Sequence, residues 1–490
     1  MSLNHSDAKV EIAHIDPKRW LVFGILMIAQ FMYIADLTVV YIALPAIQSE
    51  FKTNSATVQW VVVSYSLAYA VALITGGRLG DIFGRKQIFL WGLVGFTTAS
   101  TLCSLALNSN VLVFSRFYQG LMAALMMPQV LSIIQVIFPK NERGTAFGIL
   151  SATSGFALAA SLPLGSLLIQ SNVFDLRWRA IFLINLPLGL ATIVAASKIR
   201  ESRALVPLKL DWIGVALVSI GLFSLVYSLI AGRESGWPSW TFFSIIFAII
   251  MLILFIIYEH YCSQQNITPL LELSLFNDRN FAIGLLAMFT MSSGFPSFYL
   301  MMTIYLQLGL HFSQVNVGYV FASMAISSII ASIISIKLDI RFRKQLLTVG
   351  TVFLGTSMLL MNAIVHQINS SPTFREIIIP LSIFGFGQGL AVPTLINSTL
   401  AGGIQDKDTG SASGILSTVQ QLSGAVGVAL IGIIFFGTVE GVSTKPTLQT
   451  YNYALSISVL CNFTLFLLTF IISFFLPSSI TFKRGRSSSS

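Results

Sequence analysis

Long apolar stretches recur along nearly the whole chain and are separated by short polar segments. A helix of about 20 apolar residues is long enough to cross the ~30 Å hydrocarbon core of a bilayer. A membrane β-barrel would instead show segments of about 10 residues with alternating polarity, a pattern that we do not find here. The pattern predicts an all-α polytopic membrane protein with fourteen spans, at residues 20–43, 57–80, 88–107, 111–137, 144–170, 179–198, 212–231, 240–260, 281–307, 314–337, 346–366, 376–400, 411–437 and 453–476.

The predicted spans fall into two groups of six with two additional spans between them. Two related bundles with a site between them near mid-membrane are a common transporter plan. An internal echo supports related halves, because Gly77–Lys86 after span two and Lys337–Lys344 after span ten share an Asp and an Arg-Lys pair at one spacing. We expect an N-terminal tail at 1–19, a six-helix bundle at 20–200, an inserted transmembrane hairpin at 201–262, a connector at 263–280, a second six-helix bundle at 281–476 and a tail at 477–490.

Composition and charge agree with this topology. Hydrophobic residues make up 55% of the chain and charged residues only 10%, which excludes a soluble multidomain protein. The net charge of +9 would be compatible with nucleic-acid binding, but most lysines and arginines fall on one side of the predicted spans. Because cytoplasmic loops are enriched in Lys and Arg, this bias predicts cytoplasmic N- and C-termini and no nucleic-acid partner.

Asp36 is the one acidic residue that falls well inside a predicted span. A carboxylate near the centre of a membrane helix costs roughly 2.5–3.5 kcal/mol on insertion scales, so a chain retains one there for a purpose. We expect Asp36 to bind both a proton and a cationic substrate. The other acids at membrane depth, Glu259, Asp211, Asp81 and Asp339, fall at span ends, where contact with water makes a structural role sufficient.

Arg116 is the basic residue best placed to pair with Asp36. Span one runs outward and span four inward, which puts Asp36 roughly 10–14 Å and Arg116 roughly 8 Å below the same outer face. A neutralised pair explains how both charges are tolerated inside the membrane. A proton on Asp36 would release Arg116, and an organic cation would compete with that proton. The alternative is a purely structural ion pair.

The segment Gly77–Lys86 resembles the signature loop of the major facilitator superfamily, G-x-L-x-D-x-x-G-R-K. The resemblance implies a conformational latch formed by Gly77, Asp81, Gly84, Arg85 and Lys86. Asp81 is expected to accept hydrogen bonds from a neighbouring helix N-terminus, and the basic pair to anchor the segment at the membrane interface. Asp339 occupies the equivalent place in the second copy, which lacks both glycines.

Further motifs are similar to those of the fourteen-span drug:proton antiporter branch of that superfamily. They are Asp36–Val40 with Ala43–Pro45, the R-x-x-Q-G of Arg116–Gly120, Trp178–Pro187 and Tyr305–Gln307. The antiporter motif of span five, G-x-x-x-G-P-x-x-G-G, is incomplete, because Ser161-Leu162 replaces its Gly-Pro pair. The resemblance implies two six-helix bundles that alternate access to a central site, with spans one and four adjacent.

Several polar, aromatic and methionine side chains are candidates for lining that site. Soft and aromatic side chains suit varied apolar ligands. The alternative for each is helix packing or lipid contact. Together with Asp36, the candidate substrate-binding residues are Trp60, Tyr65, Gln119, Met127, Phe298, Gln307, Gln388, Asn397, Gln420 and Gln421.

The sequence carries no phosphate-binding P-loop, no H-E-x-x-H and no G-x-S-x-G motif. We therefore expect no enzyme, no cofactor and no metal. The expected function is proton-driven export of amphipathic, often cationic small molecules by a monomer among the lipids of a bacterial plasma membrane. One alternative is a dedicated exporter of one endogenous metabolite, such as a lipid-like or siderophore compound. Another is a membrane-embedded enzyme or sensor that reuses the scaffold.

Overall fold

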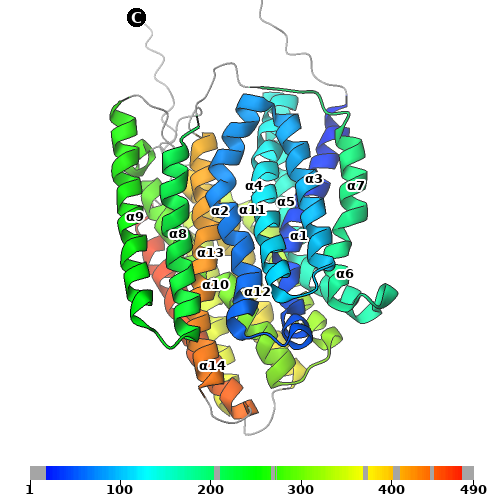
Figure 1. Ribbon diagram of the computed structural model, residues 1–490, viewed down its shortest axis with the longest axis vertical. Helices are drawn as coiled ribbons and strands as arrows, with labels where there is room; N and C mark the ends of the chain where they lie inside the picture. Colours follow the sequence, from blue (N-terminus) through cyan, green and yellow to red (C-terminus); the bar gives the residue numbers. More distant parts are fainter. Residues whose placement is uncertain are drawn as a thin grey trace, which may run out of the picture.

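The computed structural model describes residues 18–203, 210–265, 271, 273–367, 373–400, 409–441 and 446–476. These residues form a bundle of long helices that run roughly alongside one another, without a β-strand (Figure 1). Thirteen helical segments within the described part are long and apolar enough to cross a membrane. The predicted all-α polytopic architecture is therefore confirmed.

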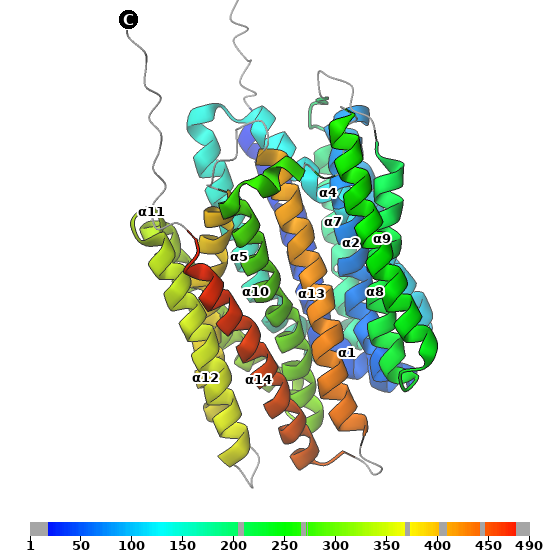
Figure 2. The ribbon, with the colours of Figure 1, turned by 90° about the vertical axis from the view of Figure 1, so that its left-hand side faces the viewer.

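The helices of the first predicted bundle alternate in direction. We call the side on which α1 begins and α14 ends the terminal side, and the opposite side the distal side (Figures 1 and 2). The helices are α1 (Arg19–Phe51), α2 (Ser55–Phe83), α3 (Arg85–Ser104), α4 (Ser109–Ile137), α5 (Lys140–Ser171), the 3-10 turns η1 (Val173–Asp175) and η2 (Arg177–Arg179), α6 (Ala180–Leu183) and α7 (Asn185–Ala196).

Two helices, α8 and α9, form a hairpin at one edge of the molecule (Figure 1), where α8 packs against α2 and α13. Most of α9 is covered by no other helix, which leaves its apolar face available to lipid. The hairpin and the remaining helices are α8 (Trp212–Glu234), α9 (Ser239–Gln264), η3 (Leu273–Asn277), α10 (Arg279–Ile304), the π-helical turn η4 (Tyr305–Gly309), α11 (Gln314–Gln367), α12 (Phe374–Leu400), α13 (Thr409–Glu440) and α14 (Leu448–Ser473).

The first and third predicted spans differ in detail from the observed helices. The first was expected to end at 43, but α1 continues through Pro45 and ends where Lys52 takes a left-handed conformation (φ 50°). A proline within a membrane helix is tolerated where neighbouring helices satisfy the backbone. Spans ten and eleven, expected at 314–337 and 346–366, correspond to the two helical segments of α11, Gln314–Ser335 and Phe342–His366, which meet at a kink at Phe342 (φ −125°, ψ 24°). The span expected at 88–107 corresponds to α3, which is less apolar than the thirteen candidates.

The signature segment is mostly helical rather than a loop. Helix α2 runs to Phe83, and the chain turns at Gly84, whose φ of 117° strongly favours a residue without a side chain. Asp81 accepts hydrogen bonds from Arg85, at 2.9 and 3.1 Å, and not from a neighbouring helix N-terminus. Instead, Glu201 caps the N-terminus of α3, because its carboxylate accepts hydrogen bonds from the backbone N–H groups of Lys86 and Gln87.

Polar contacts on the distal side tie the hairpin to both bundles. The Arg233 guanidinium at the end of α8 lies 2.8 Å from the Glu440 carboxylate of α13 and donates to the Ser55 hydroxyl of α2. The two bundles also meet directly there, where Gln307 donates to the backbone oxygen of Ile42 at 3.0 Å. The Ser166 hydroxyl adds a bond to a backbone oxygen of α11.

Candidate functional site

Asp36 and Arg116 form the expected ion pair in the interior of the first bundle. Asp36 lies in the middle of α1 and Arg116 in α4, and their exposed fractions are 1% and 0%. Arg116 Nη1 lies 2.5 Å from Asp36 Oδ2. A buried charge is tolerated only with a partner, so each of these side chains allows the other to remain charged in the interior.

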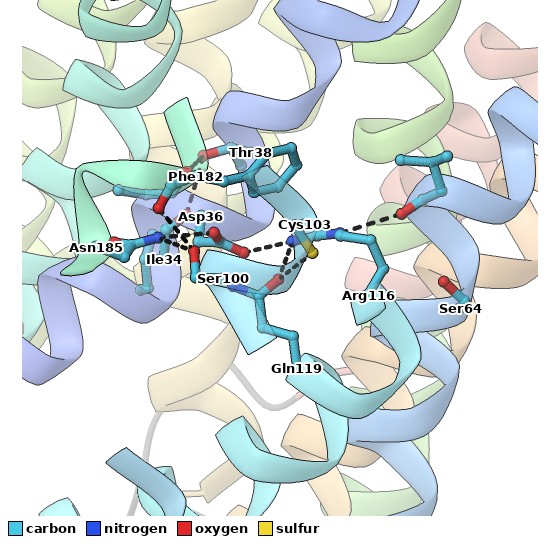
Figure 3. A network of polar contacts seen from close by, with 12 residues as sticks. Ile34, Asp36, Thr38, Ser64, Ser100, Cys103, Arg116, Gln119, Phe182 and Asn185 are labelled. Carbon is cyan, nitrogen blue, oxygen red and sulfur yellow. Dashed lines mark hydrogen bonds and ion pairs between the residues drawn. The ribbon is translucent and has the colours of Figure 1, made fainter. Parts of the chain in front are cut away.

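Other helices complete the setting of this pair (Figure 3). Asn185, the first residue of α7, donates from Nδ2 to Asp36 Oδ1 at 2.9 Å and to the Ser100 hydroxyl of α3 at 2.9 Å. Arg116 Nη1 also donates to Gln119 Oε1 at 2.8 Å, and its Nε donates to the backbone oxygen of Val61 in α2 at 3.2 Å. Four helices besides α1 thus hold one carboxylate and one guanidinium in place.

The close approach of α2 and α4 places Tyr65 beside Arg116. A Cβ at Gly120 would collide with the backbone oxygen of Tyr65, so this contact requires a glycine. The Arg116 guanidinium carbon lies 4.4 Å from the centre of the Tyr65 ring, within the range of a cation–π contact. Within little more than one turn of α4, the R-x-x-Q-G motif therefore supplies a charge from Arg116, a hydrogen-bond acceptor from Gln119 and space for α2 at Gly120.

Three buried polar atoms in this site have no hydrogen-bond partner among the described residues. They are Nη2 of Arg116, Nε2 of Gln119 and the hydroxyl of Tyr65. Buried polar atoms are almost always hydrogen-bonded, so unsatisfied ones indicate a place for water or a ligand. The arrangement therefore offers a carboxylate that could bind a cation or a proton, and beside it N–H and O–H groups that could donate to water or a ligand.

Aromatic and amide side chains connect this region to the second bundle. Tyr33, one turn before Asp36 on α1, accepts a hydrogen bond from Gln421 of α13 at 3.0 Å. Tyr41 lies on the distal side of Asp36, and its ring centre is 5.9 Å from that of Tyr299 in α10. Tyr299 in turn shares hydrogen bonds of 2.8 and 3.0 Å with Gln388. The candidates Gln388 and Gln421 therefore lie near the contact between the bundles.

Other candidate lining residues lie elsewhere. Trp60 faces the hairpin, with ring centres 6.1 Å from Phe223 and 6.0 Å from Tyr227, so its apolar surface is used in packing on α8. Met127 is buried within the hydrophobic core of the first bundle. Phe298 stacks on Phe384 at 4.2 Å inside the second bundle. For these three residues, helix packing is the better interpretation.

The remaining candidates occupy the two sides of the molecule. Gln307 lies in the π-helical turn and contacts α1 on the distal side. Asn397 is exposed near the terminal end of α12, and Gln420 is half-buried on α13. Asp339 belongs to α11, but its side chain lies outside the described part of the structure.

Sequence reasoning gave no role to Asn185, Ser100, Tyr33 or Tyr41. Asn185 belongs to the motif Trp178–Pro187, which was used only for the family resemblance. The signal that could have identified it is a polar amide among the apolar residues of a predicted span. The two tyrosines stand on the same apolar span as Asp36, where a hydroxyl needs a partner. Their importance follows from the neighbours that the fold brings to them.

Comparisons with known proteins agree with this architecture. Residues 26–428 match the family model of the Major Facilitator Superfamily. The chain is 35% identical over 429 residues to the "Probable actinorhodin transporter" of Streptomyces coelicolor, covering 87% of this chain and 74% of that protein. It is 29% identical to the "Multidrug efflux pump LfrA" of Mycolicibacterium smegmatis, covering 84% of this chain and 81% of that protein.

A similar fold occurs in a solved structure of "peptide transporter POT in complex with sulfate", with a TM-score of 0.64 and 15% identity. The match covers 94% of this chain and 95% of the transporter, and at this identity it concerns the fold alone. The family model and the relatives extend over most of the chain, and the solved transporter has a similar fold. The chain therefore belongs to the Major Facilitator Superfamily, and it is a multi-pass membrane carrier rather than an enzyme.

Proposed function

We propose that this carrier exports amphipathic, often cationic small molecules in exchange for protons. The observation that carries the proposal is the Asp36 carboxylate, buried at membrane depth and held by Arg116 and Asn185. A cationic substrate or a proton can each replace the charge that Arg116 supplies. Because both compete for one carboxylate, loading one releases the other.

Names of the relatives support export of small molecules as the direction of transport. One relative is described as a transporter of actinorhodin and another as a multidrug efflux pump. For this chain we propose the polyspecific activity, with residues of both bundles around Asp36 receiving the substrate. The second candidate, a dedicated exporter of one endogenous metabolite, is favoured by the actinorhodin relative, which has the higher identity to this chain.

The proton gradient supplies the energy in this proposal. Each charge that crosses the membrane gains about 2.3 kcal/mol per 100 mV, which is sufficient for uphill export without a nucleotide or another cofactor. We propose that the chain works as a monomer in a bacterial plasma membrane, with the terminal side facing the cytoplasm. The distribution of Lys and Arg supports this orientation.

We infer that the observed state is closed on the distal side. Gln307 and Ser166 make contacts there that join the two bundles, and Arg233 joins the hairpin to the second bundle. Alternating access then requires these bonds to break while others form on the terminal side. Arg85, Lys86 and Glu201, around the turn at Gly84, are placed to take part in that change.

Export can be tested by dye transport in everted membrane vesicles that contain the full chain. The proposal predicts ethidium accumulation that depends on a proton gradient and is lost in Asp36→Asn. The matched control is Asp175→Asn, which changes an acid on an exposed distal turn. Dyes left untouched by an abundant, folded protein would favour the dedicated exporter, and accumulation that survives Asp36→Asn would refute the coupling site.

A further inference from the structure

A second group of buried acids lies at the terminal-side base of the hairpin. Asp211 immediately precedes α8, and Glu259 lies near the end of α9. Their exposed fractions are 7% and 0%. The sequence placed both at span ends, where water or the membrane interface was expected to suffice for a structural role, but the protein itself buries both side chains.

One oxygen of each carboxyl group is satisfied by a backbone donor. Asp211 Oδ1 accepts from the N–H of Gly214 at 2.9 Å and so caps the start of α8. Glu259 Oε2 accepts from the N–H of Leu271 at 3.0 Å, in the connector that leads to α10. The two acids thus join the two ends of the hairpin to the segment that enters the second bundle.

The other two carboxyl oxygens face each other. Asp211 Oδ2 and Glu259 Oε1 are buried and have no hydrogen-bond partner among the described residues, although the Tyr258 hydroxyl lies near Asp211. Both oxygens lie over Gly214, where an added Cβ would fall 2.3 Å from Asp211 Oδ2 and 2.6 Å from Glu259 Oε1. The two oxygens are therefore at most 4.9 Å apart.

The charges of the described residues around this pair sum to one negative charge. Among these residues, Arg78 of α2 is the basic group that acts on Glu259, and the Tyr258 hydroxyl of α9 lies near Asp211. One guanidinium beside two carboxylates leaves one negative charge in a buried place. Two carboxylates in contact cannot both remain ionised at little cost, so one proton bound between them is the usual solution.

We propose that Asp211 and Glu259 form a second proton-binding site, in which one proton is shared between Oδ2 of Asp211 and Oε1 of Glu259. The proton comes from water on the terminal side and forms an O–H···O bond that satisfies both facing oxygens. With Arg78, the charges of the described residues at the site then balance. This site is separate from Asp36, because within the described part of the chain neither Asp211 nor Glu259 shares a hydrogen bond or ion pair with the residues around Asp36.

The position of the site gives the proton a structural consequence. When the proton leaves, two carboxylates face each other in a buried site, and the side chain of Glu259 is driven from Asp211. Glu259 Oε2 holds the backbone of Leu271, so its movement disturbs the connector that precedes η3 and α10. The hairpin and the second bundle are therefore joined by a bond whose strength depends on protonation on the terminal side.

Infrared spectroscopy of the purified full chain in lipid nanodiscs tests this proposal. The carbonyl stretch of a protonated carboxylic acid is separate from the amide and carboxylate bands, and Asp36→Asn is used as the background so that Asp36 does not contribute. At neutral pH we expect one such band in that background. We expect it to disappear in both Glu259→Gln and Asp211→Asn, because removing either partner of a shared proton removes the same proton.

A band that survives both substitutions would overturn the proposal. Loss in only one of the two variants would show that one carboxyl group holds its proton alone, and this would overturn sharing. Should either variant fail to fold, carbon-13 labelling of all glutamate or all aspartate carboxyl groups in the background protein provides the same information. A band that shifts with neither label would then contradict the assignment to Glu259 and Asp211.

Discussion

The carboxyl groups of Asp36 and of Glu259 are buried to a similar extent but kept in different ways. Asp36 faces a guanidinium at 2.5 Å and an amide donor at 2.9 Å. Glu259 faces a second carboxyl group and a backbone N–H, with Arg78 as the nearby cation. Burial alone therefore does not assign a role to a membrane acid, because the donors around it decide which ion it binds.

Because their partners differ, the Asp36 site and the Asp211–Glu259 pair can bind different ions. A carboxylate paired with an arginine can exchange that partner for a proton or an organic cation, because each of these also neutralises the charge of the carboxylate. A carboxyl pair has room for a small ion only, since its facing oxygens lie within 2.3 and 2.6 Å of the same point over Gly214. We therefore place substrate competition at Asp36 and protonation without substrate at the hairpin.

The largest effect on this comparison should come from Arg116→Ala. Removing one partner of a buried ion pair leaves an uncompensated charge and costs about 3–5 kcal/mol of unfolding free energy. Chemical unfolding in detergent micelles measures the change. In the double variant Asp36→Asn/Arg116→Ala no buried charge remains, so we expect part of the loss to be recovered. A single-variant loss below about 1 kcal/mol, as for an exposed pair, would contradict the pairing.

Glycine substitutions should disturb both sites to a smaller extent. Gly120→Ala places a methyl group against the Tyr65 backbone, and Gly214→Ala places one between the two carboxyl groups. Overpacking of this kind costs about 1–3 kcal/mol. Gly155→Ala is the control, because nothing lies within 4 Å of an added Cβ there. Melting temperatures that fall equally in all three variants would argue against close contact at either site.

Asn185→Ala tests the part of the Asp36 site that has no counterpart at the hairpin. The substitution removes the donor shared by Asp36 and Ser100, and leaving buried acceptors unsatisfied costs about 1–3 kcal/mol. Asn316→Ala, at an exposed amide, should stay within about 0.5 kcal/mol. The same unfolding measurement compares the two, and equal stability in both variants would mean that Asn185 does not hold Asp36.

The smallest effect is expected for Asp211→Asn. An asparagine caps a helix about as well as an aspartate, so the start of α8 should be preserved and the stability should change by no more than about 0.5 kcal/mol. Asp211→Ala loses the cap as well, at a cost of about 0.5–2 kcal/mol. A larger loss in Asp211→Asn than in Asp211→Ala would show that the cap is not the main task of this residue.

Much of the fold was accessible from the sequence because lipid imposes a simple rule on spanning helices. Apolar length located most of the helices, and the depth of Asp36 and Arg116 along oppositely directed spans predicted their pairing. The short connection between the two segments of α11, with its kink at Phe342, was not predictable, because polar residues at a membrane surface permit either a longer loop or a tight turn. The path of α1 beyond Pro45 likewise depends on neighbouring helices.

The details of the site were less accessible than the fold. Which face of a membrane helix points inward cannot be read from a uniformly apolar sequence, so the sequence left both lining and helix packing open for Trp60, which packs on α8. Glu201, which caps α3, is distant in sequence and lies in a polar linker without a motif. The pairing of Asp211 with Glu259 depends on the hairpin geometry, which brings the two ends of separate helices together.

The most direct test of the coupling site is substrate-induced proton release in vesicles that contain the purified full chain. In the native protein, addition of a transported cation should displace protons, and in Asp36→Asn this release should vanish while the protein remains folded. Glu259→Gln, which leaves Asp36 and its donors unchanged, should retain the release. Equal proton release from the native protein and from Asp36→Asn would contradict the account.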